Sequence, residues 1–148
     1  NRNAARETGH AEAYALEIMT LIGRAYYFGE RRWTLEALAA HGSGASSKQL
    51  EDLVQALEDK HLIVATHDGP TSYVPGRAIE TIALGDIAAA VSAREASGTH
   101  LPAVQQVIDQ IEGAIAQSLE GRTLRDLVLA DERRSAAVAV DADAPKPS

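Results

Sequence analysis

The segment from Trp33 to Val74 constrains the fold more than any other part of the chain. It begins with a short helix-forming run, TLEALAAH. After a break rich in Gly and Ser it continues with a longer amphipathic run, SKQLEDLVQALEDK. Two short β-prone runs follow, LIVAT and TSYV, and the turn-forming residues Asp-Gly-Pro lie between them. A helix, a turn, a second helix and a hairpin in this order predict a winged helix.

Helical periodicity continues on both sides of this segment. Apolar residues recur at helical spacing from Ala11 to Phe28, and Gly29 is placed to end that helix. Further helices are expected over 83–92, over 102–119 and from Thr123 onward. The sequence thus predicts a mainly α fold with a small β-hairpin, a winged helix-turn-helix followed by C-terminal helices. We expect a flexible segment at 1–10, one domain over 11–130 and a disordered tail over 131–148, where small residues, Asp and Pro dominate.

The second helix of the winged helix, the candidate recognition helix, carries more acidic than basic residues. Its two lysines stand against four carboxylates: Lys48 and Lys60 against Glu51, Asp52, Glu58 and Asp59. The wing sequence HDGPTS has no Arg or Lys, and the whole chain has a net charge of −7. Because a helix that lies among phosphates is expected to be basic, this charge predicts that specific binding to duplex DNA is unlikely.

Composition argues against a cofactor. The chain has no cysteine, which excludes disulfides, iron–sulfur clusters held by thiolates and thiol nucleophiles. Its histidines are scattered and form no metal-binding run such as HExxH; they are His10, His41, His61, His67 and His100. We therefore expect no metal, no cofactor and no catalytic residue, so the chain is not expected to be an enzyme.

Two short motifs have both a catalytic and a structural interpretation. His67-Asp68-Gly69 contains an acid/base pair, but Asp-Gly also supplies the backbone conformations of a hairpin turn. Ser46-Ser47-Lys48 resembles a Ser/Lys nucleophile pair, but a helix N-cap followed by a first-turn lysine explains it more simply. We prefer the structural interpretation of both motifs. Thr34 is the expected N-cap of the preceding helix.

Basic residues are interleaved with aromatic residues where the first helix ends. Arg24, Arg31, Arg32 and Trp33 lie close together in the sequence, beside two tyrosines. Such a mixture can bind anions or lipid headgroups, so these four residues are a candidate anion or headgroup patch. The alternative is an ordinary helix end, with the aromatic side chains packed inward and the arginines solvated.

The helix over 102–119 carries a candidate helix–helix interface. Val104, Ile108, Ile111 and Ile115 follow a spacing of four and three residues, as in a short coiled-coil seam. In a monomer this stripe has to lie on the winged-helix body, where the first helix is the expected partner. In a homodimer it pairs with its own copy. We expect the monomer, because two heptads bury too little area for a tight dimer by themselves.

Three segments together resemble the cytoplasmic C-terminal region of the YihY/BrkB family of inner-membrane proteins. They are AYYFGERRWTLEALA at 25–39, SYVPGRAIETIALGDIAAAV at 72–91 and EGRTLRDLVLA at 120–130. The resemblance implies a noncatalytic regulatory or assembly domain in the cytoplasm. Its partners would be the membrane portion of the same polypeptide, in the bacterial inner membrane, and other proteins. That family has also been labelled ribonuclease BN, which implies a nuclease as a further alternative, but this chain lacks the clustered His and Asp of a metal-dependent nuclease.

The middle and C-terminal motifs also resemble IscR-type winged-helix repressors. The shared features are the passage from the wing into the next helix, a long dimerisation helix and a TLxDL-type ending. This resemblance implies the alternative function of a DNA-binding transcription regulator. The chain departs from the cluster-binding members by having no cysteine ligands, and from the type in general by having no basic recognition helix.

Overall fold

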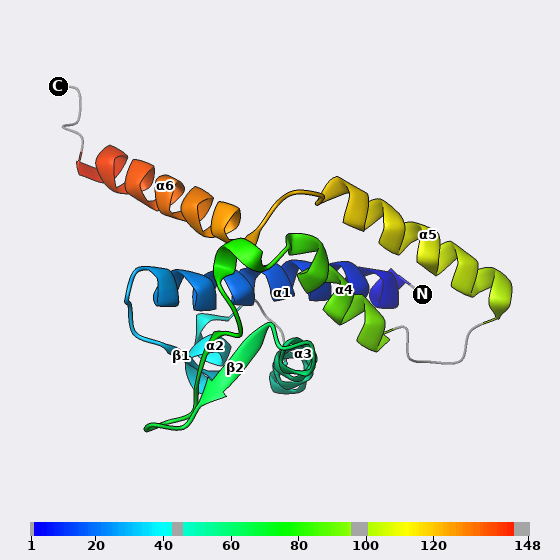
Figure 1. Cartoon of the computed structure of the whole chain (residues 1–148), viewed down its shortest axis with the longest axis horizontal. Helices are drawn as coiled ribbons and strands as arrows, with labels where there is room; N and C mark the ends of the chain where they lie inside the picture. The colour runs from blue at the N-terminus through cyan, green and yellow to red at the C-terminus, as the bar shows by residue number, and fades with distance from the viewer. Residues whose placement is uncertain (1, 43–45, 96–100, 144–148) are drawn as a thin grey trace.

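The structure is a computed structural model that describes residues 2–42, 46–95 and 101–143. In chain order its elements are α1 (Arg2–Tyr27), β1 (Trp33–Thr34), α2 (Leu35–His41), α3 (Ser47–Asp59), β2 (Ile63–Thr66), β3 (Ser72–Pro75), the 3-10 turn η1 (Ile79–Thr81), α4 (Leu84–Glu95), α5 (Pro102–Ser118) and α6 (Leu124–Asp143) (Figure 1). The predicted fold class is confirmed, because the elements are mainly helical and the strands form one small antiparallel sheet.

The sheet has three strands in the order β1-β3-β2, so a third strand joins the predicted hairpin, within the two or three strands that the sequence predicts for the wing. Ser72 lies opposite Thr66 on one side and opposite Thr34 on the other, so all three strands meet at this row. The extra strand β1 spans two residues, which is too short to produce an alternating pattern in the sequence. It joins the start of α2 to the wing.

The helix-turn-helix begins at the residues that the sequence indicates. The Thr34 hydroxyl accepts a hydrogen bond from the Ala37 amide at 3.1 Å and caps α2. Ser46 caps α3 with a full capping box: its hydroxyl accepts from the Gln49 amide at 3.1 Å, and the Gln49 side chain accepts from the Ser46 amide at 2.8 Å. The N-cap interpretation of these residues therefore holds.

Helix α1 is central to the hydrophobic core. Its buried residues Ile18, Met19 and Ile22 share one cluster with buried side chains of α3, α4 and α6. Gly23 lets α6 approach closely, because a Cβ there would lie 3.0 Å from Leu124 Cδ2. In Figure 1, α1 runs across the middle of the molecule, above the winged helix and beneath α6. The N-terminal helix thus joins the winged helix to the C-terminal helices.

Both chain ends are more helical than the sequence suggests. Helix α1 already begins at Arg2, within the segment expected to be flexible. Helix α6 runs on to Asp143, through most of the segment 131–148 expected to be disordered. Its first turns are anchored by the buried Leu124 and Val128, and the alanine-rich continuation favours a helix. Beyond Glu132 the described side chains of α6 are exposed, and the helix projects from the body (Figure 1).

Candidate nucleic-acid interface

The N-terminal turn of α3 is exposed and free of acidic residues. Ser47, Lys48 and Gln49 face solvent, whereas Leu50 and Leu53 turn into the core. The acidic residues of α3 begin only at its second turn. The open amides of a helix N-terminus carry partial positive charge, so this end of α3 attracts anions even though the whole helix is acidic.

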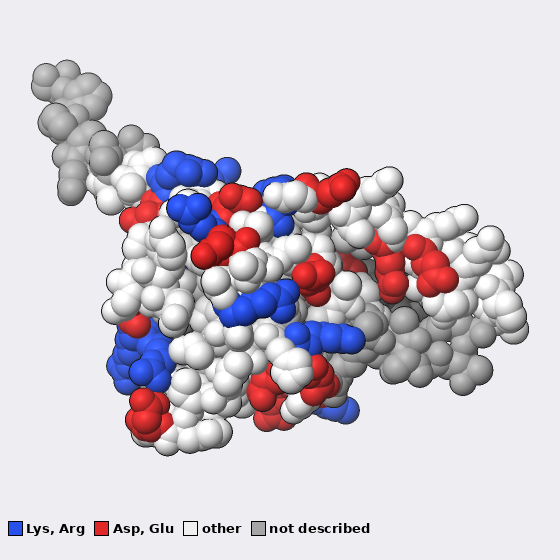
Figure 2. All heavy atoms as spheres, in the orientation of Figure 1, with Lys and Arg blue, Asp and Glu red and all other residues white. Residues whose placement is uncertain are grey.

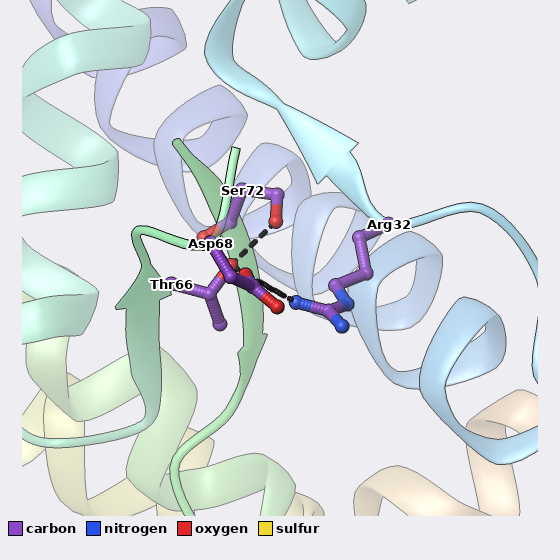
Figure 3. A network of polar contacts seen from close by, with 4 residues as sticks. All are labelled: Arg32, Thr66, Asp68 and Ser72. Atoms are coloured by element: carbon purple, nitrogen blue, oxygen red, sulfur yellow. Dashed lines mark hydrogen bonds and ion pairs between the residues drawn. The ribbon is translucent and has the colours of Figure 1, made fainter. Parts of the chain in front are cut away.

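Strand β2 of the wing hairpin packs against α3, and a polar network lies where the hairpin turns. Arg32 Nη1 contacts Asp68 Oδ1 at 3.1 Å and donates a hydrogen bond to Thr66 Oγ1 at 3.2 Å (Figure 3). The Thr66 and Ser72 hydroxyl oxygens are 2.6 Å apart. A hydrogen bond from its own backbone amide, and then the Arg32 guanidinium, hold the pKa of Asp68 below its usual value. The sequence did not indicate this network, because Arg32 and Asp68 are 36 positions apart.

The structure separates the four residues of the predicted anion patch. Arg24 lies between α1 and α6 and forms ion pairs with three carboxylates, those of Glu30, Asp131 and Glu132. Burial opposes the charge of Arg24, but these carboxylates prevail and raise its pKa above the usual value. The guanidinium is thus already surrounded by negative charge, which leaves it a poor ligand for a further anion.

The other three residues of that patch lie near the wing. Arg31 is exposed, and Arg32 contacts the wing as described above. Trp33 is half-buried and packs edge-to-face against His41, with 5.5 Å between ring centroids. Only the arginine pair at the wing therefore stays available for an anion among these four residues.

The predicted stripe of α5 lies on one side of the helix and is only partly covered by the rest of the protein. Ile108 and Ile115 are half-buried on the side that packs against α4, which corrects the expectation that α1 is the partner of this helix. Val104 and Ile111 point outward and are 44% and 55% exposed. Val107, which the heptad spacing missed, is exposed on the same side. No residue of α5 is fully buried, so the described structure leaves an apolar face without a partner.

Charges of both signs mix over the visible face of the molecule, and Figure 2 shows no continuous basic surface there. Of the two motifs with a catalytic interpretation, Ser46 caps α3, and His67 and Asp68 belong to the exposed wing turn. Within the described residues, no group of three His, Asp or Glu side chains is placed to hold a metal ion.

Neither a protein-family model nor a curated protein matches the chain. Several solved structures do. The structure of CymR from B. subtilis, described as a global cysteine regulator, is 26% identical with a TM-score of 0.59, and the match covers 81% of this chain and 94% of that one. CymR from Staphylococcus aureus is 24% identical with a TM-score of 0.60, over 80% and 95% of the two chains. IscR from T. potens is 23% identical with a TM-score of 0.54, over 95% and 90%.

These comparisons correct the YihY/BrkB assignment. The structures that the chain resembles along nearly their whole length are CymR and IscR, so the assignment is wrong. Three predictions that depended on this assignment are therefore wrong as well. They are the membrane portion as a partner, the inner-membrane location and the ribonuclease label. None of the described helices is long and apolar enough to cross a bilayer. The comparisons favour the alternative resemblance, to IscR-type regulators, and the expectation that the chain is not an enzyme agrees with the description of CymR as a regulator.

The prediction that specific DNA binding is unlikely is also contradicted, because the matched structures are those of regulators with this fold. The prediction rested on charge summed over the whole of α3, which takes no account of where along the helix the charges lie. The acidic residues lie beyond its first turn, and in a helix-turn-helix the N-terminal residues of the recognition helix contact the base edges.

Proposed function

We propose that this chain is a winged-helix transcription regulator that binds duplex DNA in a sequence-specific manner as a homodimer. The observation that carries the proposal is the exposed, acid-free first turn of α3, a helix that packs against strand β2 of the wing hairpin. The likeness to CymR over 94% of that chain supports it.

The first turn of α3 has the groups that duplex recognition needs. Lys48 is exposed and can contact a phosphate or a guanine edge, and Ser47 can donate to or accept from most bases. Gln49 uses its amide oxygen in the capping box, which holds its side chain at the helix start and leaves its amide nitrogen to donate. Because α3 is capped and packed on the core, these groups are held in place before DNA arrives.

The carboxylates of the second turn can contribute to sequence recognition, although they weaken the attraction of α3 to phosphates. Glu51 and Asp52 are both exposed. A carboxylate on a recognition helix accepts a hydrogen bond from the amino group of cytosine and is repelled by phosphate. Such a helix binds DNA weakly in general and is selective for sites that place cytosine opposite these residues. The acidic character of α3 thus favours specificity over affinity.

Dimerisation follows from the outward face of α5. A winged helix of this size contacts one half-site, and two-fold pairing of α5 helices would present two copies of α3 to a palindrome. Val104, Val107 and Ile111 supply the apolar surface for that pairing. The candidate helix–helix interface of the sequence is therefore kept as a proposal, with Val107 added and with Ile108 and Ile115 assigned to packing inside the subunit.

The proposal is tested by selecting duplexes from a random-sequence library with the full chain. Enrichment of a palindromic motif with submicromolar affinity, measured by fluorescence anisotropy in the presence of competitor DNA, is the expected result. A library that stays random after repeated rounds of selection would show that the chain is not a sequence-specific DNA-binding protein.

Lys48→Glu is expected to weaken binding to the selected duplex by about 10- to 100-fold, because it removes one cation and places a carboxylate against the phosphates. Lys60→Glu is the matched control. Lys60 is also exposed, and its replacement by Glu changes the charge by the same amount. It lies at the C-terminal end of α3, away from the proposed groove contact. Anisotropy titrations of both variants at one salt concentration decide the point. Equal losses in the two variants would mean that net charge, not the first turn of α3, determines affinity.

A further inference from the structure

Arg32 gives the wing a cation that the wing sequence lacks. The turn at 67–71 contains no Lys or Arg. Arg32 lies in the segment before β1 and reaches across the end of the sheet to Thr66 and Asp68 (Figure 3). It spans the row where Thr34, Ser72 and Thr66 meet, so β1, β3 and β2 together set its position.

The pair formed by Arg32 and Asp68 is exposed and exchangeable. The two side chains are 46% and 71% exposed. Exposed ion pairs of this kind contribute little to folding, because solvent screens them and both side chains lose freedom. The three strands are already joined by their own backbone pairing. The guanidinium can therefore leave Asp68 for a stronger acceptor without disturbing the fold.

We propose that Arg32 is the phosphate contact of the wing and that Asp68 competes with DNA for it. This inference rests on the proposed function. In the free protein Asp68 stands where a phosphate oxygen would lie, and Thr66 keeps the guanidinium at the wing base. On a duplex the phosphate displaces Asp68 from the guanidinium.

This competition sets a threshold for binding. On an unrelated duplex the wing gains one phosphate contact and loses one carboxylate contact, so nonspecific affinity stays low. On the correct site the base contacts of α3 hold the duplex close enough for the exchange to be completed. Asp68 is then a specificity-determining residue, although it touches no base.

The test is a double-mutant cycle in the full chain, with Asp68→Asn, Arg32→Gln and the double variant. Binding to the selected duplex and to an unrelated duplex of equal length is followed by anisotropy over about 50–200 mM KCl. Asp68→Asn is expected to bind the unrelated duplex about three- to ten-fold more tightly, with a salt slope steeper by about one phosphate contact. Arg32→Gln is expected to weaken binding to both duplexes. In the double variant, the gain in affinity that Asp68→Asn produces should be abolished.

The matched control is Asp86→Asn. Asp86 forms a comparable exposed pair with Arg77, at 3.3 Å, but it lies on α4 rather than in the wing. This variant should leave both affinities unchanged, and circular dichroism melts establish that every variant is folded. A gain from Asp68→Asn that persists in the Arg32→Gln background, or that Asp86→Asn reproduces, would show a general charge effect and overturn the inference. If the wild-type chain bound neither duplex, the proposed function itself would be overturned.

Discussion

Replacing Ile111 with Asp is expected to convert the proposed homodimer into a folded monomer. Ile111 lies in the middle of the outward face of α5, between Val107 and the later turns, and is 55% exposed in the isolated subunit. In a pairing of two α5 helices the new carboxylate would be buried without a partner, at a cost of several kcal/mol. The dissociation constant of the dimer should rise by at least about 100-fold. Sedimentation equilibrium at micromolar concentration measures the mass, and circular dichroism measures helix content.

Gln106→Asp is the control for this experiment. Gln106 is exposed and lies on a different face of α5, so the same carboxylate there should leave the dimer intact. An Ile111→Asp variant that still sediments as a dimer would place the subunit interface elsewhere. An unfolded variant would mean that Ile111 is needed inside the subunit, in contrast to its observed exposure.

Gly76→Ala should destabilise the fold by about 3 kcal/mol or more, enough to unfold a marginally stable domain. A Cβ at position 76 would lie 2.0 Å from the carbonyl oxygen of His61, which is backbone and cannot swing away. The Gly76 amide also donates to the Leu62 carbonyl at 2.9 Å, which fixes the approach of the two segments. His61 has a positive φ of 57°, so this corner between α3 and β2 has little freedom to relax.

Gly113→Ala is the matched substitution for that experiment. Gly113 lies within α5, and a Cβ there would meet nothing within 4 Å. Because alanine favours the helix over glycine, this change should stabilise the protein by about 0.5–1 kcal/mol. Chemical denaturation gives both free energies of unfolding. A Gly76→Ala variant as stable as the wild type would show that the contact between position 76 and the His61 carbonyl can widen without a loss of folding free energy.

The parts of the fold that the sequence predicts are those that local chemistry determines. Thr34 and Ser46 begin α2 and α3 because their hydroxyls accept from amides three residues away. Asp-Gly marks the wing turn for an equally local reason. The strand β1 escapes prediction because its existence depends on pairing with β3, far along the chain.

The candidate site was predicted less well, since it depends on which distant residues meet. The sequence places Arg24 next to Arg31 and Arg32, but the fold turns Arg24 toward α6 and its carboxylates. The heptad spacing of α5 finds an apolar stripe without showing that Ile108 faces α4 while Ile111 faces outward. Charge summed over α3 conceals the acid-free first turn, and the proposed DNA contact depends on position along the helix.

The closure of α1 by α6 has a consequence for biosynthesis. Arg24 pairs with Asp131, 107 positions later, and the buried Leu124 and Val128 cover the same end of α1. A ribosome delivers α1 well before these residues of α6. Until then the nascent chain can assemble its winged helix, but one side of α1 stays uncovered and offers apolar surface to chaperones and proteases. A chain that stops before α6 would therefore keep this side of α1 exposed, and synthesis of α6 would be a condition for a long-lived protein.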